Sequence, residues 1–362
     1  MKIMRVGVAS VAVMALALTG CAANETDPAP GTSTTTQGGL SGSLQGTGAS
    51  STAAAQEAWI AAFQQANTGV QITYSPEGSG AGRKAFTGGG ADFAGSDRAL
   101  KDDEMVAGSF APCAADSNAV NLPIYISPIA IIFNLDGVDS LNMDADTIAK
   151  IFSGQITNWN DPAIAALNPG VTLPDLAITT VHRSDNSGTT ENFTATLAAA
   201  APTVWTQAAS GDWPTAFGGE AAKGTSGVVS AVTAGKDAIG YADESQIQGA
   251  NTIKYGSNGT FVGPTAEAAA QVVDASPKVA GRSDRDQAIE LDRTAAGYPF
   301  VLVSYAIACE TYSDASTGSL VKAYLGYIAS EEGQNAAQEA AGSAPLSSDL
   351  REKVLSSIEQ IA

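Results

Sequence analysis

Apolar and polar residues follow two different periods along this chain, and each period predicts a type of element. Val70–Ser75 (VQITYS) alternates with a period of two, as a half-buried strand does, and Leu40–Gln45 also suits a short strand. Between them, Trp59, Ile60 and Phe63 mark the buried face of a helix. The folded part is therefore expected to begin with a strand, a helix and a second strand.

Helices and strands are expected to alternate along most of the remaining sequence. Further helices are expected through residues 84 and 86, at 101–107, 144–152 and 161–167, from the 184–190 loop to 200, at 225–234, and over most of 319–362. Further strands are expected at 92–97, 177–182 and 238–242. This alternation is typical of α/β proteins.

Two long apolar runs of β type, Leu122–Leu135 and Tyr298–Ala308, could each pass from one lobe into another. If they are paired crossover strands, one lobe comprises residues 40–122 plus 300–362, and the other comprises residues 123–299. About 320 folded residues also exceed the usual size of a single core. We therefore expect an α/β protein with two mixed-sheet lobes joined by crossover strands.

The N-terminus has the pattern of a secretory signal peptide over residues 1–20. Lys2 and Arg5 precede an uncharged apolar stretch that is too short for a membrane-spanning helix. The closing residues LTGC resemble the lipobox of bacterial lipoproteins, in which the cysteine, here Cys21, is lipidated. Residues 21–39 hold almost no large apolar side chain and predict a flexible tether. The protein is thus expected to be extracytoplasmic and lipid-anchored to the outer face of the membrane.

Acidic residues outnumber basic ones, with a formal net charge of −19 that becomes −21 when Lys2 and Arg5 leave with the signal peptide. Nucleic acid is therefore excluded as a partner, because its affinity depends on basic patches that neutralise phosphates. A small anion is not excluded. A closed cleft can hold one through local dipoles and a single arginine.

Two cysteines, Cys113 and Cys309, remain after lipidation of Cys21. In an oxidising compartment an even pair favours one disulfide, and the alternative is two buried thiols. The chain has one histidine and no C-x-x-C motif, so we expect no metal site and no cofactor.

Three loops rich in Ser, Thr and Gly are each expected between a strand and the start of a helix. They are Gly48–Ser51, Gly78–Gly80 and Ser187–Thr189. Helix N-termini present unpaired N–H groups and a dipole that favours negative charge, and small residues let an anion approach the backbone. A single loop of this kind usually only caps its helix. The prediction of an anion site depends on the three loops converging.

Four ordered segments resemble motifs of the phosphate-binding proteins of high-affinity phosphate ABC importers, the PstS family. Asp92–Asp97 (DFAGSD) is similar to their D-F-x-x-S-D motif, and His182–Thr190 (HRSDNSGTT) to their R-x-D-x-S-G-T-[ST] loop. Ile151–Trp159 (IFSGQITNW) is similar to I-[FY]-x-G-x-I-x-x-W, and Ala238–Tyr241 (AIGY) to G-A-I-G-Y. The similarity extends in order from about residue 40 to the C-terminal helices.

The resemblance implies the type II periplasmic binding protein fold, with phosphate bound in the cleft between two α/β lobes. It also implies capture of inorganic phosphate outside the membrane and delivery to the permease subunits of an ABC importer, without enzymatic activity. The phosphate ligands implied by the motifs are Ser50, Ser51, Ser79, Asp97, Arg183, Ser187, Gly188 and Thr189. Asp185 is implied to orient Arg183 from behind. The family usually has G-A-[ST]-F-P in the first loop, whereas this chain has GASST, so Ser51 departs from the pattern.

The implied role of Asp97 is to check the anion for a proton. Phosphate near neutral pH carries at least one proton, and sulfate carries none. An ionised buried carboxylate can only accept hydrogen bonds, so it gains about 1.5–3 kcal/mol from protonated phosphate. Against sulfate it would face another bare oxygen. The alternative is that Asp97 only caps a helix near Lys101.

Other functions fit the sequence less well. A secreted phosphatase or esterase would have to use His182, and the chain has no G-x-S-x-G elbow and no His/Asp cluster for two metals. Gly80–Ala85 fits the dinucleotide pattern G-x-G-x-x-A, but the export signal disfavours a cytosolic cofactor. Binding of sulfate or molybdate, and a pure adhesion or signalling role, remain alternatives.

Overall fold

The structure is a computed structural model that describes residues 39–257 and 259–362. The signal peptide expected at 1–20, the lipidation site Cys21 and nearly all of the tether lie outside the described residues. Among the described residues, no helix combines the length and the apolar character that crossing a membrane requires.

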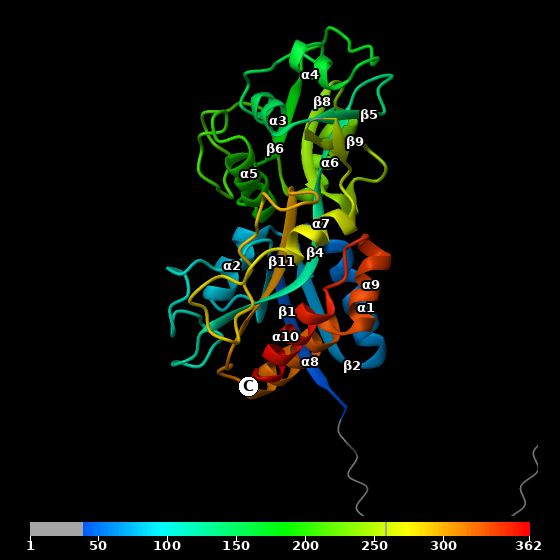
Figure 1. Cartoon of the computed structure of the whole chain (residues 1–362). Helices are drawn as coiled ribbons and strands as arrows, with labels where there is room; N and C mark the ends of the chain where they lie inside the picture. Colours follow the sequence, from blue (N-terminus) through cyan, green and yellow to red (C-terminus); the bar gives the residue numbers. More distant parts are fainter. Residues whose placement is uncertain (1–38, 258) are drawn as a thin grey trace, which may run out of the picture. The chain divides into compact units, whose positions relative to one another are not determined.

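The elements alternate as expected for an α/β protein (Figure 1). The helices of the described residues are α1 (Ala53–Ala66), α2 (Ser79–Thr87), α3 (Ala145–Phe152), α4 (Pro162–Leu167), α5 (Gly188–Ala200), α6 (Gly224–Ala234), η1 (Glu244–Gln246, a 3-10 helix), α7 (Ala266–Asp274), α8 (Ala315–Ala329), α9 (Glu331–Ala341) and α10 (Ser348–Glu359). The strands are β1 (Ser41–Gly48), β2 (Gly69–Ser75), β3 (Phe93–Ser96), β4 (Ala119–Asn134), β5 (Ser140–Met143), β6 (Thr179–Arg183), β7 (Glu220–Ala222), β8 (Ala238–Asp243), β9 (Asn251–Ser257), β10 (Thr260–Val262) and β11 (Val301–Cys309).

The strands lie in the order β2-β1-β3-β11-β4-β8-β6-β7, and β9 lies beside β4, β5 and β10. β1 is parallel to β2 and β3, whereas β11 is antiparallel to β3 and β4. β6 is parallel to β8, which is antiparallel to β4. The expected α/β class with mixed sheets is confirmed.

The long strand β4 belongs to two groups of elements. Its residues 119–128 pair with β11, and its residues 129–134 pair with β8. We call the group around β1, β2, β3 and α8–α10 the first lobe, and the group around β6, β8, α3, α5 and α6 the second lobe (Figure 1). The two long apolar runs of the sequence thus form the adjacent strands β4 and β11. The lobe boundaries at 122/123 and 299/300 stay predictions.

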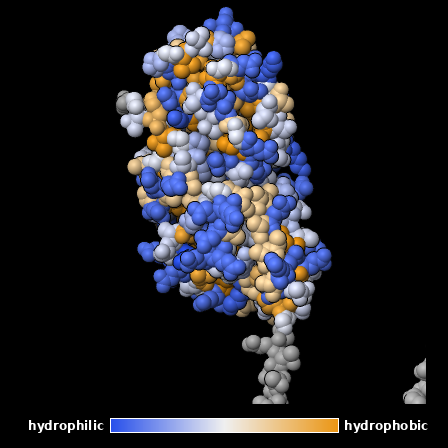
Figure 2. Space-filling view, turned by 90° about the vertical axis from the view of Figure 1, so that its right-hand side faces the viewer, coloured by the Kyte–Doolittle hydropathy of each residue, from blue (hydrophilic) through white to orange (hydrophobic). Residues whose placement is uncertain are grey.

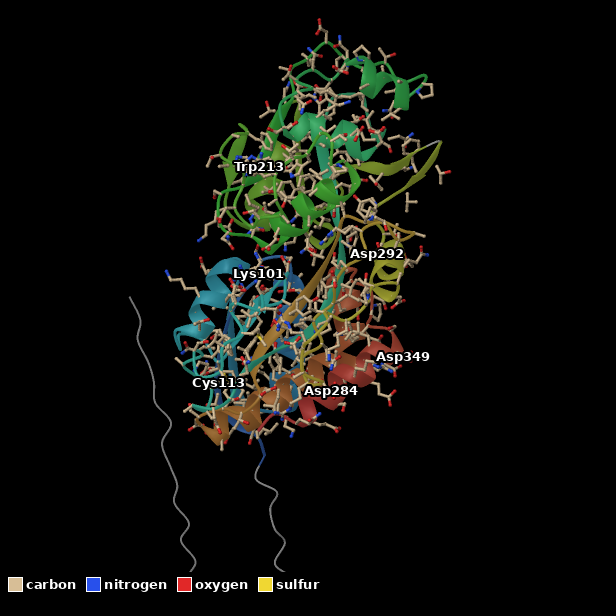
Figure 3. All side chains as sticks on the ribbon, turned by 60° about the vertical axis from the view of Figure 1, so that its left-hand side comes forward. Lys101, Cys113, Trp213, Asp284, Asp292 and Asp349 are labelled. Carbon is tan, nitrogen blue, oxygen red and sulfur yellow. A yellow bond between two sulfur atoms is a disulfide. The ribbon has the colours of Figure 1, made fainter. Side chains whose placement is uncertain are left out.

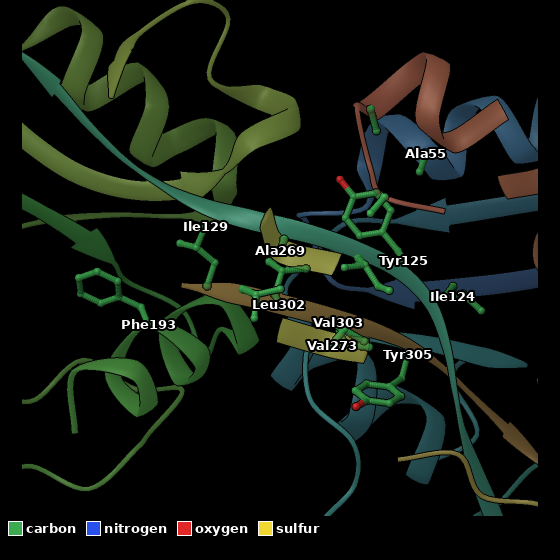
Figure 4. Packing of buried hydrophobic residues seen from close by; sticks show 14 of the residues in the cluster. Ala55, Ile124, Tyr125, Ile129, Phe193, Ala269, Val273, Leu302, Val303 and Tyr305 are labelled. Atoms are coloured by element: carbon green, nitrogen blue, oxygen red, sulfur yellow. The ribbon is translucent and has the colours of Figure 1, made fainter. Parts of the chain in front are cut away.

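Apolar side chains fill the space on both sides of β4 and β11. Every residue of β11 is buried, as are all but the last of β4, which explains why both strands are apolar without alternation. Figure 4 shows Ile129 on β4 and Leu302 on β11 among the packed side chains, with Phe193 of α5 nearby. Phe193 stacks on Tyr241 of β8 with 4.3 Å between ring centroids.

In the first lobe, the structure joins Cys113 to Cys309 in a disulfide bond across 196 residues of sequence. Cys309 is the last residue of β11, so the bridge connects the end of the central strand to the loop before β4. On the face drawn in Figure 2, hydrophilic residues cover much of the surface and hydrophobic patches lie between them.

The helix expected at 101–107 is wrong, because these residues form turns. The carboxylate of Glu104 accepts the N–H of Lys101 at 2.7 Å and both terminal nitrogens of Arg98 at 2.6 and 3.0 Å. Val106 is 54% exposed, so the segment has little apolar surface to bury as a helix. The short elements β5, β7, β9, β10 and α7 were not expected from the sequence, because their apolar patterns are brief.

Candidate functional site

Four helices begin at one place between the two lobes. α1 and α2 come from the first lobe, and α5 and α6 come from the second. The three loops singled out in the sequence precede α1, α2 and α5, and the convergence on which the anion prediction depends is present. Helix N-termini carry unpaired N–H groups and a partial positive charge, so their meeting creates a site for an anion.

Asp97 lies at the centre of this convergence, directly after β3. Its side chain is buried, and each of its carboxylate oxygens accepts a hydroxyl from a different lobe. Ser51 donates to Oδ1 at 2.6 Å from the start of α1, and Thr189 donates to Oδ2 at 3.0 Å from the first turn of α5. A carboxylate oxygen has two lone pairs, so each oxygen can accept one more hydrogen bond.

The electrostatic environment of Asp97 has two opposing effects. Burial raises the pKa of the Asp97 carboxyl, and the hydroxyls of Ser51 and Thr189 and the charge of Arg183 lower it, leaving a net upward shift from 3.8. The ionised form therefore depends on donors supplied by both lobes. This arrangement gives a buried acceptor among many donors.

Arg183 ends β6 and supplies the positive charge of the site. Its guanidinium is buried and makes a bidentate pair with Asp185, with Nε at 2.8 Å from Oδ1 and the terminal nitrogen at 2.5 Å from Oδ2. Asp185 Oδ1 also accepts the N–H of Gly224 at 3.1 Å, and these contacts lower the pKa of Asp185 despite its partial burial. Asp185 thus orients the guanidinium and ties it to the start of α6.

Ser79 and Gly188 bring α2 and α5 close to Asp97. Ser79 Oγ accepts the N–H of Asp97 at 3.1 Å. A Cβ atom added to Gly188 would lie 2.6 Å from Asp97 Cβ and 2.8 Å from Ser79 Oγ. Only glycine therefore allows the first turn of α5 to approach the first lobe this closely.

The remaining expected residues, Ser50 and Ser187, lie at helix starts. Ser50 Oγ accepts the N–H of Thr225 at 3.1 Å and lies 3.0 Å from the hydroxyl of Thr225. Ser187 caps α5, because its Oγ accepts the N–H of Thr190 at 3.2 Å. The N–H of Ser187 donates to the carbonyl of Gly211 at 2.9 Å. The donor that Ser187 can offer a ligand is therefore its hydroxyl group. All expected ligand positions are therefore brought together, while their contact with an anion stays a prediction.

The structure adds residues that sequence reasoning missed. Gly224 and Thr225 begin α6 beside Ser50 and Asp185. The hydroxyl of Tyr241 lies 2.7 Å from that of Thr190 and accepts the N–H of Arg183 at 3.3 Å. The first residues of α6, Gly-Thr-Ser, have the composition of the three other loops, so this signal could have identified the fourth helix start.

A second buried carboxylate, Asp243, lies at the end of β8 near the site. Its Oδ1 accepts the hydroxyl of Tyr125 at 3.0 Å and the N–H of Ser245 at 3.0 Å, and its Oδ2 has no hydrogen-bond partner among the described residues. Burial raises the pKa of Asp243 to about 7, with a further contribution from the charge of Asp97. Of the described residues, no group of three or more His, Cys, Asp and Glu could hold a metal ion.

Comparisons with known proteins agree on one family. The model of the PBP superfamily domain matches residues 32–332. Phosphate-binding protein PstS 3 of Mycobacterium tuberculosis is 36% identical over 342 residues, which cover 90% of each chain. PstS 2 of the same species is 33% identical over 380 residues, which cover 100% of each chain.

Solved structures share the fold. A high-affinity periplasmic phosphate-binding protein, solved bound with phosphate, has a TM-score of 0.71 and 24% identity, over 87% of this chain and 93% of its own. A phosphate-binding protein from Stenotrophomonas maltophilia has a TM-score of 0.68 and 22% identity over the same shares. The type II periplasmic binding protein fold is thus confirmed. This chain belongs to the PBP superfamily and, within it, to the PstS family of phosphate-binding proteins.

Proposed function

We propose that this protein captures inorganic phosphate outside the cytoplasmic membrane and delivers it to an ABC importer. The observation that carries the proposal is the position of Asp97, a buried acceptor at the meeting point of four helix N-termini and one guanidinium. Donors satisfy the oxygens of phosphate, and the carboxylate accepts a hydrogen bond from the hydroxyl that phosphate retains. The family membership supports the same function.

In this proposal, Arg183 pairs with the anion, and Asp97 accepts a hydrogen bond from the protonated oxygen of the anion. Further donors come from the helix starts of both lobes: Ser50, Ser51, Ser79, Ser187, Gly188 and Thr189. Asp185 fixes the guanidinium of Arg183 and leaves one of its terminal nitrogens for the ligand, because the pair with Asp185 uses Nε and the other terminal nitrogen. From the start of α6, the N–H groups of Gly224 and Thr225 hold Asp185 and Ser50 in position.

Calorimetric titration of the purified protein with phosphate tests the binding function. We expect tight binding in the unaltered protein and a loss of about 100-fold or more in Arg183→Gln, because two charge-assisted hydrogen bonds are removed. Arg351→Gln is the control, since Arg351 pairs only loosely with Glu331 at 3.7 Å, outside the site. The absence of phosphate binding in the unaltered protein, or binding of sulfate or molybdate in its place, would reject the proposal.

We further propose that Cys21 carries a lipid that holds the protein at the outer face of the membrane, and that permease subunits receive the phosphate there. The support is the lipobox pattern and the tether composition of residues 21–39. Replacing Cys21 by Ala is expected to move the protein from the membrane fraction to the medium or periplasm and to lower phosphate uptake. Retention of the Cys21→Ala protein in the membrane fraction would contradict the anchor.

A further inference from the structure

An ion-pair cluster joins the lobes on one side of the site, and we call it the Glu191 clasp. Glu191 lies in the first turn of α5, in the second lobe. Its Oε2 is 2.9 Å from Arg98 Nε and its Oε1 is 3.1 Å from Lys101 Nζ. Both cations belong to the first-lobe segment that follows Asp97, and Figure 3 shows Lys101 at the edge of that lobe that faces the second. One carboxylate thus bridges the lobes through two cations.

The Glu191–Arg98 pair of the clasp is more buried than a second charged pair across the lobes, Glu77–Lys223. The side chains of Glu191 and Arg98 are 13% and 16% exposed, whereas Glu77 and Lys223, which pair at 2.6 Å, are 54% and 65% exposed. Exposed pairs contribute little, since water and salt screen them. The guanidinium of Arg98 is already fixed by its bidentate bonds to Glu104, so its pairing with Glu191 costs little side-chain entropy. Of these two charged contacts, the Glu191 clasp contributes more to lobe closure.

The clasp is also connected to the site itself. Asn192, the residue after Glu191, donates to the carbonyl of Asp97 at 2.6 Å. A cleft of about 210 Å³ is lined by Asp97, Arg98, Glu191 and Asn192, together with residues of β11 and the segment before it. The clasp therefore forms part of the wall between solvent and the buried carboxylate.

We propose that Glu191 is a positioning residue that holds the lobes closed over the anion and so slows its release. This inference rests on the proposed phosphate-binding function. Gly188 and Thr189 present donors to the ligand, and Glu191, on the same turn of α5, fastens that turn to the segment carrying Asp97. Separation of the lobes must break both ion pairs before phosphate can leave. Breaking a partly buried charge pair changes dissociation rates more than association rates.

Stopped-flow measurement of phosphate association and dissociation in Glu191→Gln tests the proposal. The variant keeps the size and polarity of the side chain and removes its charge. We expect dissociation to accelerate about tenfold with the association rate unchanged within twofold, and the preference for phosphate over sulfate to be retained. We also expect dissociation from the unaltered protein to accelerate with salt more steeply than dissociation from the variant.

Glu331→Gln is the matched control, because Glu331 pairs with Arg351 at 3.7 Å within the first lobe and away from the cleft. Lys101→Gln, which alters a half-exposed side chain, is expected to show a smaller acceleration of the same kind. An unchanged dissociation rate in Glu191→Gln, or an equal change in Glu331→Gln, would overturn the role of Glu191 while leaving phosphate binding intact. Failure of the unaltered protein to bind phosphate would instead reject the proposed function.

Discussion

Two buried carboxylates of different environment lie near the meeting point of the lobes. Asp97 receives hydroxyl donors from both lobes and lies near Arg183, whereas Asp243 has an oxygen without a partner among the described residues. The pKa of Asp243 is raised to about 7, above that of an exposed aspartate. Its donors and the nearby charge of Arg183 therefore make Asp97 the carboxylate suited to accept a hydrogen bond from a ligand.

Asp243 gives a prediction about stability and pH. Its pKa rises on folding from 3.8 to about 7, so the folded state binds the proton more tightly than the unfolded state. The stability that Asp243 contributes is then full below pH 4 and is lost as the pH rises to 7. We expect the free energy of unfolding of Asp243→Asn, compared with that of the unaltered protein, to improve by a few kcal/mol between pH 4 and pH 7. Denaturant unfolding across this range measures it, and a difference independent of pH would contradict the shifted pKa.

At the residue scale, the sequence was informative where a motif was complete. The D-F-x-x-S-D and R-x-D-x-S-G-T-[ST] patterns drew attention to Asp97, Arg183 and Asp185, and the structure brings these residues together. Glu191 and Arg98 could not be predicted, because isolated charges in a sequence usually lie on a solvated surface. Their pairing depends on a contact between segments 93 residues apart, which no local pattern encodes.

At the scale of the elements, the anion site is formed by four helix N-termini, those of α1, α2, α5 and α6. Each start follows the end of a strand or a turn, and the small residues there let the four N-termini approach one another. Gly188 makes one of these close approaches, since a Cβ atom added there would collide with both Asp97 and Ser79. The geometry of the site is therefore fixed by helix positions as much as by side chains.

Gly188→Ala tests this geometry. The backbone of Gly188 has no positive φ, and alanine is a better helix former, so thermal stability of the second lobe is expected to be unaffected or improved. The added Cβ would collide with Asp97 and Ser79, so phosphate affinity is expected to fall by at least tenfold. Gly227→Ala in α6 is the control, because its nearest atoms lie at an ordinary contact distance of 3.6 Å. Equal phosphate affinity of Gly188→Ala and Gly227→Ala would argue against close approach of α5.

Most elements could be predicted from periodicity, and the exceptions have physical causes. The helix expected at 101–107 does not form. The carboxylate of Glu104 binds Arg98 and the N–H of Lys101, and these contacts hold the segment in turns. The helix at 225–234 was expected, but its contact with Ser50 was not, because the two lie 175 residues apart in the sequence. Composition identifies a helix start, and only the tertiary fold decides what that start faces.

At the scale of the whole molecule, β4 and β11 connect the two lobes. Their uninterrupted apolar sequence predicted buried, paired strands, and the antiparallel pairing of residues 119–128 with β11 is observed. The type II fold was implied by family resemblance, since the chain length and the two long apolar runs indicate two α/β lobes but not the order of their strands. Closure over an anion requires both the connecting strands and the two lobes that they join.

The disulfide gives a prediction about the whole molecule. Cys113 and Cys309 are 196 positions apart in the sequence, and removing a bridge over so long a loop relaxes a constraint on the unfolded chain. The double variant Cys113→Ala, Cys309→Ala is expected to lose about 2–5 kcal/mol of unfolding free energy in denaturant titration. Figure 3 shows Cys113 in the first lobe, away from the second, so phosphate affinity of the folded variant is expected to be unchanged. Unaltered stability would show that the bridge does not form in solution.

The central claim is that Asp97 selects phosphate by accepting a hydrogen bond from its protonated oxygen, and competition between phosphate and sulfate tests this most directly. The measurement is calorimetric titration of the unaltered protein and of Asp97→Asn with each anion. The account predicts tight phosphate binding and no sulfate binding in the unaltered protein. In Asp97→Asn the preference for phosphate should shrink by a factor of about 100 or more, because the amide can donate to a fully deprotonated oxygen. Equal affinity of the unaltered protein for both anions, or an unchanged preference in Asp97→Asn, would contradict the account.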